Sequence, residues 1–378
     1  MAISAGASWP DPLSMRSGQR ITEPGQWPQR RREIIEQLLP PVYGDMPPTP
    51  AWTRCECLHS ALLRRFGGAR LLSCRVTPLG MAPFLLRLFV PAGQGPVPVI
   101  VSGDGCWHYA DDAALAAMLA RGYAFAQFNR VEIAADPGAA PSDLALPQAA
   151  ARHGTLASWA WAYHRVVDVL CSLEWLDTTA IAVVGHSRGG KAALLAGATD
   201  ERIALTSANN SGAGGAGSWR HRGPGAETLA DLLREYGYWF APGLHAYAGR
   251  EQELPLDQHL LKALVAPRAL LTTEALEDHW ANPQGSWQSH RAARCVFELL
   301  GADRRMDIVF RAGGHDHGLA DWNTLLDFGD AVLRGMPQRL AAPADPFPDL
   351  PAPVFRSPCG VAAEAPVQTV ASAAPIAR

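Results

Sequence analysis

The segment GHSRG, residues 185–189, places a serine between two glycines, and this pattern could support nucleophilic chemistry. The β-branched run Ala180 to Val184 precedes it and the alanine-rich stretch KAALLAGA follows it. A chain that turns from a strand into a helix within so few residues leaves no room for flanking side chains, so glycines are needed there. The turn lifts the Ser187 hydroxyl out of the sheet at a helix N-terminus, where negative charge is stabilised. We therefore predict that Ser187 is a nucleophile.

A serine hydroxyl needs a general base, and two histidines follow the last strand pattern. In sheets that carry such a turn, the catalytic residues follow in the order serine, acid, histidine. The segment MDIVFRAGGHDHGL places His315 after two glycines, with His317 two residues further along. We prefer His315 as the base because it comes first off the strand. His317 is then expected to line the pocket or to cap the next helix.

The acid should follow the preceding strand, where the segment ALLTTEALEDHWANP offers three carboxylates. These are Glu274, Glu277 and Asp278. Asp278 lies two residues before Trp280 and five before Pro283, close to where such a loop turns toward the histidine. We predict Asp278 as the acid and keep Glu277 as the alternative.

Two cations lie close to the serine. We expect the backbone N–H of Arg188 in an oxyanion hole, with a second N–H from the loop SGDGCW around Gly105 and Cys106. The guanidinium of Arg188 could add a charged donor to the same oxygen. Lys191 stands four residues after Ser187, which is one helical turn on the same face. Both cations would then border the reacting carbonyl, which suits a polar substrate better than an apolar acyl chain.

Strand and helix patterns alternate along the part of the chain that must position these residues. Such alternation predicts a mostly parallel sheet with helices on both faces. A pair of antiparallel strands is expected earlier, over residues 70–93. The later strand patterns cover residues 97–103, 123–129, 180–185, 202–208, 266–273 and 306–314, and the helix patterns cover 159–173, 191–198, 287–300 and 322–335.

Three regions are expected from the composition along the chain. We predict a disordered segment over residues 1–20, a catalytic domain over 21–336 and an Ala/Pro-rich tail over 337–378. The first residues have Pro and Asp where a signal peptide needs an apolar stretch, so no export signal is expected.

The overall composition excludes several classes of partner. Of the 378 residues 48% are hydrophobic, which is enough for a large core, and the net charge of -3 leaves no basic footprint for nucleic acid. No apolar run is long enough to cross a membrane. The 7 cysteines are scattered and are expected to be unpaired thiols, with no metal site and no cofactor. We expect a monomer; its substrate, a small-molecule or polysaccharide ester, is implied by the family resemblance that follows.

Several long segments resemble the glucuronoyl esterases, carbohydrate esterase family 15. The resemblance runs from about Trp27 to Leu333 and implies the α/β-hydrolase fold, a three-layer αβα sandwich. It also implies hydrolysis of esters of 4-O-methylglucuronic acid, as in lignin–xylan linkages, through an acyl-enzyme. The segments that carry it are residues 157–170, 185–220, 253–271, 277–286 and 311–328.

Carried over one residue at a time, the resemblance places the nucleophile on Ser187, an oxyanion contact on Arg188 and the base on His315. It also implies a set of substrate contacts. These are Lys191 and Glu235, which would contact sugar hydroxyls, Trp280, which would pack on the sugar ring, and Glu227, where fungal members have Gln.

One triplet departs from the family pattern. Many members carry the acid in Glu-Ser-Gly after the strand that follows the serine, but residues 210–212 are Asn-Ser-Gly. An amide cannot stabilise a charged imidazole, and such a change in a serine triad costs about 10⁴-fold. Either the acid has moved to the Glu277–Asp278 loop, which we prefer, or catalysis is impaired. A general carboxylesterase or acetylxylan esterase and a non-catalytic carbohydrate-binding homologue stay open as alternatives.

Overall fold

A sheet of nine strands forms the centre of the computed structural model, which describes residues 8–93, 95–107, 110–137, 153–340 and 345–356 and the backbone of 362–363. The strand order is β10-β9-β8-β7-β5-β6-β4-β3-β2. The strands are β2 (Thr53–Leu63), β3 (Ala69–Pro78), β4 (Phe84–Val90), β5 (Val97–Ser102), β6 (Ala124–Phe128), β7 (Leu176–His186), β8 (Leu205–Asn209), β9 (Ala269–Ala275) and β10 (Met306–Arg311).

The half of the sheet from β6 to β10 is parallel, and the half from β2 to β4 is antiparallel. Strand β4 joins the two halves by pairing antiparallel with β6. The predicted parallel sheet and the predicted antiparallel pair over residues 70–93 are both confirmed. The long edge strand β2 was not predicted.

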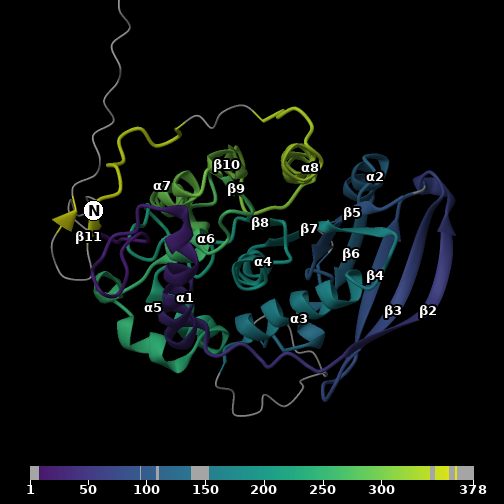
Figure 1. Cartoon of the computed structure of the whole chain (residues 1–378), viewed down its shortest axis with the longest axis horizontal. Helices are drawn as coiled ribbons and strands as arrows, with labels where there is room; N and C mark the ends of the chain where they lie inside the picture. The colour runs from purple at the N-terminus through teal and green to yellow at the C-terminus, as the bar shows by residue number, and fades with distance from the viewer. Residues whose placement is uncertain are drawn as a thin grey trace, which may run out of the picture.

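Helices cover both faces of the sheet, which makes the three-layer sandwich that the sequence predicts (Figure 1). Alternate residues of β5 point to opposite faces of the sheet. Ile100 packs into one apolar cluster, and Val99 and Val101 pack into the other. Helices α2 (Asp112–Ala120) and α8 (Leu319–Arg334) supply the cluster that contains Ile100. The second cluster takes residues from α1 (Trp27–Leu38), α3 (Thr155–Leu170), α4 (Arg188–Thr199), α5 (Leu229–Tyr236), α6 (Gln258–Ala263) and α7 (Pro283–Leu299).

The described part of the N-terminal segment is folded against the domain. Trp9 is buried, its ring stacks on His221 with a centroid distance of 4.5 Å, and Leu13 and Met15 also lie in the interior. The prediction of disorder over residues 1–20 is therefore wrong for residues 8–20; residues 1–7 lie outside the described part. The apolar residues of this segment are too irregularly spaced to give a helix or strand period.

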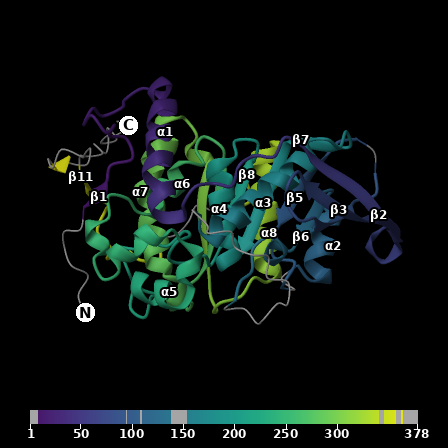
Figure 2. The ribbon, with the colours of Figure 1, turned by 90° about the horizontal axis from the view of Figure 1, so that it is seen from below.

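The described part of the predicted tail also returns to the domain. Strand β11 (Phe355–Arg356) pairs with β1 (Trp9–Pro10) and with β12 (Ala362–Ala363) in a small second sheet. Phe347 packs edge-on against Phe310 of β10. Figure 2 shows β1 and β11 together beside α1 and α7, at the opposite end of the molecule from β2. Residues 341–344, 357–361 and 364–378 of the predicted tail lie outside the described residues.

Across the described ranges, no helix has both the length and the apolar character needed to cross a lipid bilayer.

Helix α4 packs so closely on β8 at Gly197 that replacing this helix glycine with alanine should destabilise the protein. Alanine is better than glycine in a helix by about 1 kcal/mol, yet Gly197→Ala should lower the free energy of unfolding by about 1–3 kcal/mol. A Cβ at Gly197 would overlap Oγ1 of Thr206 and lie 2.7 Å from its Cγ2 and 2.8 Å from its Cβ, so rotation of Thr206 gives no relief. Urea unfolding followed by circular dichroism measures the change. Gly243→Ala is the control, because its nearest neighbour would be 3.8 Å away, and stabilisation by Gly197→Ala would contradict the prediction.

Candidate active site

Ser187 occupies the sharp turn between β7 and α4. Its backbone has φ 55° and ψ −123°, which is a strained conformation for a residue with a side chain. The turn is held in place because the Ser187 N–H donates to the Asn209 carbonyl of β8 at 2.9 Å and the Lys191 N–H donates to the Ser187 carbonyl at 3.1 Å. The side chain therefore stands at the end of the strand and at the start of the helix, as the sequence predicts.

The glycines of the motif are required by two close contacts. A Cβ at Gly185 would overlap the backbone of Gly189, and a Cβ at Gly189 would overlap the carboxylate of Asp104. Asp104 belongs to the loop after β5, and its Oδ2 accepts from the His186 N–H at 2.8 Å while Oδ1 pairs with the buried guanidinium of Arg130. Asp104 therefore ties the loop after β5 to the serine turn. Sequence reasoning did not identify this tie.

His315 and Asp278 form a close pair at the end of two neighbouring strands. Nδ1 of His315 lies 2.6 Å from Oδ2 of Asp278, and the side chain of Asp278 is 5% exposed while that of His315 is 42% exposed. Asp278 follows β9 and His315 follows β10, and these strands are parallel neighbours. A carboxylate on Nδ1 fixes the imidazole tautomer and leaves Nε2 for a substrate or a serine proton.

The other two carboxylates of the acid loop have different partners. Glu277 is exposed, and its Oε2 accepts from the Gly313 N–H in the turn before His315. Glu274 is fully buried, and burial raises the pKa of its carboxyl group. Of the three candidates, Asp278 is the one that contacts the imidazole.

Asn210 connects the acid loop to the histidine loop. Its Oδ1 accepts from the Ala275 N–H at 2.7 Å, and its Nδ2 donates to the Asp316 carbonyl at 3.0 Å. The residue adopts a positive φ of 41°. The amide therefore bridges the two loops that carry Asp278 and His315 instead of binding the imidazole, which agrees with a relocated acid.

A buried histidine, His186, packs directly against the exposed His315. The rings of His186 and His315 lie 4.5 Å apart, and Nδ1 of His186 lies 2.5 Å from Oδ1 of Asn209. Burial and the nearby His315 lower the pKa of His186 to about 4, so the ring is neutral at neutral pH. Sequence reasoning missed this residue, although it stands inside the serine motif.

His317 does not have either of the roles expected for it. Its ring is buried and stacks on Trp322 of α8 with a centroid distance of 4.5 Å. It neither caps α8, which begins after Gly318, nor lies at an exposed pocket wall. Its ring also stacks on that of His186, with a centroid distance of 5.7 Å, so it packs behind the ring that contacts His315.

The expected oxyanion hole needs one correction. The Gly105 N–H donates to the Phe128 carbonyl at 3.0 Å, so it is not available to a substrate oxygen. Cys106 is the remaining candidate of the expected pair in this loop. The backbone N–H of Arg188 opens α4, where the helix dipole also favours negative charge.

The Arg188 guanidinium is held by a carboxylate and by aromatic rings. Nη1 of Arg188 lies 2.9 Å from Oδ2 of Asp136, and the rings of Tyr236 and Trp239 each lie 4.9 Å from the guanidinium carbon. Burial opposes the charge, but Asp136 more than offsets it, so the pKa of Arg188 lies above its ordinary value. Asp136 was missed by sequence reasoning because it belongs to no motif.

Lys191 is buried one turn after Ser187. Its Nζ donates to the Ser211 carbonyl at 2.7 Å and to the Ala213 carbonyl at 2.6 Å. An ammonium group has three N–H donors, so within the described residues one of them remains for a ligand. Burial lowers the pKa of Lys191 to about 8, and the negative charge of Glu227 opposes that shift.

The other expected substrate contacts divide into two groups. Trp280 is 52% exposed, and its carbonyl accepts from the Glu227 N–H at 3.1 Å. Trp280, Glu227 and Lys191 therefore belong to one wall. Glu235 is exposed on α5 and pairs with Arg234 at 3.1 Å, so the structure does not join it to this wall.

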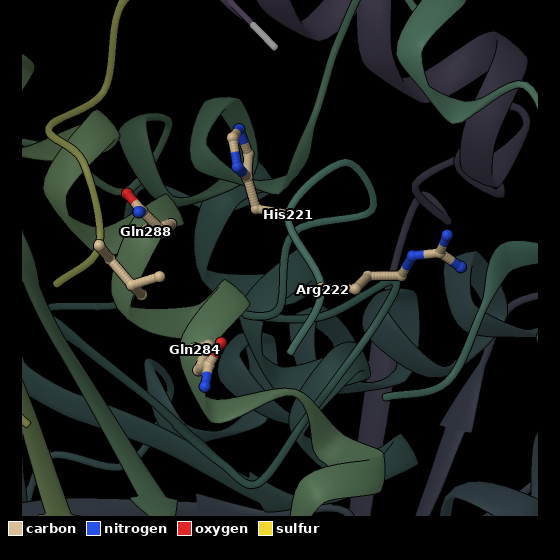
Figure 3. Close-up of a pocket in the computed structure, with 5 residues that line it drawn as sticks. His221, Arg222, Gln284 and Gln288 are labelled. Carbon is tan, nitrogen blue, oxygen red and sulfur yellow. The ribbon is translucent and has the colours of Figure 1, made fainter. Parts of the chain in front are cut away.

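A shallow pocket lies elsewhere on the molecule, between α7 and the returning tail (Figure 3). Its polar lining comes from His221, Arg222, Gln284 and Gln288, and the side chain of Arg222 points away from the two glutamines. Gln288 donates to the Pro351 carbonyl at 3.0 Å. Neither Ser187 nor His315 lines this pocket, so it is separate from the serine turn.

A mostly parallel sheet with a strained serine between strand and helix, and an acid–histidine pair on the next strands, defines the class of α/β-hydrolases. Comparison with known proteins narrows the class. The family described as "Glucuronyl esterase, fungi" matches residues 80–301, which is more than half of the chain. The chain belongs to the glucuronoyl esterase family, carbohydrate esterase family 15.

Individual proteins agree with this assignment. A 4-O-methyl-glucuronoyl methylesterase from Podospora anserina is 32% identical over 81% of this chain, and the match spans 63% of that protein. Carbohydrate esterase MZ0003, from an unknown prokaryotic organism, is 30% identical over 86% of this chain and 90% of its own length. The structure of a glucuronoyl esterase from Caldicellulosiruptor kristjansonii superposes with a TM-score of 0.75 at 30% identity, covering 91% of this chain and 97% of that one.

The acid assignment can be tested with two nearly isosteric changes. Asp278→Asn should lower kcat by about 10⁴-fold, because the amide cannot stabilise the imidazolium formed on His315. Glu277→Gln should lower kcat by less than about tenfold, since Glu277 binds the Gly313 backbone and not the imidazole. Steady-state kinetics on a glucuronate ester measures both. A larger loss for Glu277→Gln than for Asp278→Asn would exclude Asp278 as the acid.

Proposed function

We propose that this chain is a serine esterase that hydrolyses esters of 4-O-methylglucuronic acid, with Ser187, His315 and Asp278 as its catalytic residues. The observation that carries the proposal is the 2.6 Å contact between Asp278 and His315, whose ring lies 4.5 Å from that of His186, the residue before the strained Ser187. The similar Podospora protein is named for action on this ester class. The half-buried Arg188 and the buried Lys191 at the same turn suit a polar acyl group.

The reaction proceeds through an acyl-enzyme. Oγ of Ser187 attacks the ester carbonyl carbon while Nε2 of His315 takes the hydroxyl proton. Asp278 stabilises the positive imidazole, and the Arg188 N–H together with its guanidinium stabilises the negative oxygen of the tetrahedral intermediate. The carbon–oxygen bond to the alcohol then breaks, and the alcohol leaves with the proton from His315.

Water completes the cycle. His315 removes a proton from a water molecule, whose oxygen attacks the acyl carbon, and the second tetrahedral intermediate collapses. The bond to Oγ of Ser187 breaks, Ser187 recovers its proton from His315, and the free uronic acid is released and ionises. No group other than the chain's own residues and water enters these steps.

Recognition is proposed to act on the acid part of the ester. The free N–H of Lys191 donates to a ring hydroxyl, Trp280 covers part of the ring, and Glu227 accepts from a hydroxyl. These contacts do not involve the alcohol part of the ester. The enzyme should therefore accept varied alcohols, including the lignin alcohol of lignin–xylan esters. Glu235 is proposed as a contact to a more distant part of the substrate, because it lies on the exposed surface of α5.

The decisive experiment compares substrates and a nucleophile variant. Wild-type protein should hydrolyse methyl glucuronate with a much higher kcat/KM than acetylated xylan, because the acetyl group has no ring for Lys191 and Trp280 to bind. Ser187→Ala should lower kcat by about 10⁴-fold or more and keep the circular dichroism spectrum. Preference for acetylated xylan would favour an acetylxylan esterase, and absence of turnover on every ester would favour a carbohydrate-binding homologue.

Lys191 provides a test of acid-side recognition. Lys191→Met keeps the aliphatic stem and removes the charged donor, which is worth about 1.5–3 kcal/mol, so kcat/KM on methyl glucuronate should fall by about ten- to a hundredfold. On a simple acetate ester the same change should have little effect. Equal losses on both esters would show that Lys191 supports the turn and not the sugar.

The pH profile gives a second readout for the same residue. Because its pKa is lowered to about 8, Lys191 is charged below that pH and loses its charge above it. For wild-type protein kcat/KM on methyl glucuronate should therefore fall as the pH rises through about 8. The fall should be weaker on an acetate ester and in Lys191→Met.

A further inference from the structure

Each cation beside Ser187 has a buried carboxylate as its neighbour. The side chain of Asp136 is 1% exposed and contacts Nη1 of Arg188 at 2.9 Å. Glu227 is 5% exposed and attracts Lys191 electrostatically. Arg188 is therefore paired with a carboxylate inside the fold, and Lys191 has a compensating carboxylate in its surroundings.

Asp136 is held so that one of its oxygens faces Arg188. Its Oδ1 accepts from the Tyr238 hydroxyl at 2.5 Å and from Nε1 of Trp239 at 3.2 Å. Its Oδ2 accepts from Arg188. Tyr238 and Trp239 are neutral donors, so among the described residues Arg188 is the cation that contacts Asp136. The side chain of Arg188 is itself 15% exposed, so little water screens the pair.

In the proposed reaction, the pairing of Arg188 with Asp136 affects how tightly the product is bound. The substrate ester is neutral, but the uronate product is an anion whose carboxylate occupies the place of the reacting carbonyl. An unpaired guanidinium binds a carboxylate by strong charge-assisted hydrogen bonds, and this attraction grows where water is excluded. An uncompensated Arg188 would therefore hold the product more tightly than the substrate and slow its release.

We propose that Asp136 is a charge-compensating residue, which keeps the Arg188 site electrically neutral so that it stabilises a transient oxyanion without retaining the uronate product. This inference rests on the proposed function, because it needs a neutral substrate and an anionic product. Asp136 acts through Arg188 and does not itself contact the substrate. Its effect is on the preference of the site for an anion over a neutral ligand of the same shape.

The test measures that preference by calorimetric titration with two probes, glucuronate and glucuronamide, near neutral pH. The anion preference is the ratio of their dissociation constants, and it should follow the net charge of the 136–188 pair. Asp136→Asn makes the pair positive and should tighten glucuronate by about tenfold relative to glucuronamide. Arg188→Gln makes the pair negative and should weaken glucuronate relative to glucuronamide. The double variant is neutral again and should return the ratio to the wild-type value.

Two controls separate this role from a structural one. Tyr238→Phe removes a hydrogen bond from Asp136 but leaves its charge, so the anion preference should stay at the wild-type value. Removing Asp136 alone leaves a buried unpaired cation, which can prevent folding. If Asp136→Asn does not fold, Arg188→Gln and the double variant still set the expected order, with the double variant preferring glucuronate more than Arg188→Gln does.

The outcomes are distinct from those for the function itself. The inference is supported if the anion preference is strongest when the 136–188 pair is positive, intermediate when it is neutral and weakest when it is negative. It is also supported if glucuronate inhibits Asp136→Asn at lower concentrations than it inhibits the wild-type protein. Equal changes for glucuronate and glucuronamide, or a preference that ignores the pair charge, would overturn it. If the wild-type protein hydrolyses methyl glucuronate but the variants show no such order, only the inference about Asp136 is wrong. If the protein hydrolyses no glucuronate ester, the proposed function is wrong.

Discussion

The strained backbone of Ser187 is the constraint on which the rest of the site depends. A side-chain-bearing residue at φ 55° and ψ −123° costs about 1–3 kcal/mol, and the surrounding contacts must hold it. Here β7 and α4 approach so closely that Gly185 and Gly189 can carry no side chain, and the carboxylate of Asp104 fills the space beside Gly189. The same carboxylate accepts the His186 N–H. The serine turn and the loop after β5 are thereby fixed as one unit.

Parallel strands bring the other groups to the same edge. Strands β7, β8, β9 and β10 are consecutive neighbours, so the residues after each of them lie along one side of the sheet. Ser187, Asn210, Asp278 and His315 follow these four strands in that order. A carboxylate after β8 or after β9 can therefore approach the same histidine. In this chain β9 supplies it, and Asn210 uses the position after β8 to join the two neighbouring loops.

Local patterns in the sequence were enough to predict the sheet class, the serine turn and the order of the candidate residues. They act over a few residues, as with the glycines around Ser187. The buried carboxylates Asp104 and Asp136 were missed, because their importance comes from partners 82 and 52 residues away. The folded start of the chain was missed for the same reason: Trp9 is buried by His221 and by a strand near residue 355, and nothing close to it in the sequence indicates either contact.

The electrostatics of the site follow from burial and not from the overall charge. A buried cation is tolerated only when a partner compensates most of its desolvation cost, and Arg188 and Lys191 each obtain a nearby carboxylate within the fold. Because the carboxylate of Asp136 is fixed by Tyr238 and Trp239, its compensation of Arg188 does not depend on mobile counterions. A site of this kind recognises an oxygen by the direction of its donors and not by attraction for any anion. Under the proposed function, such a site would stabilise negative charge that develops at one atom during the reaction and would bind free carboxylates only weakly.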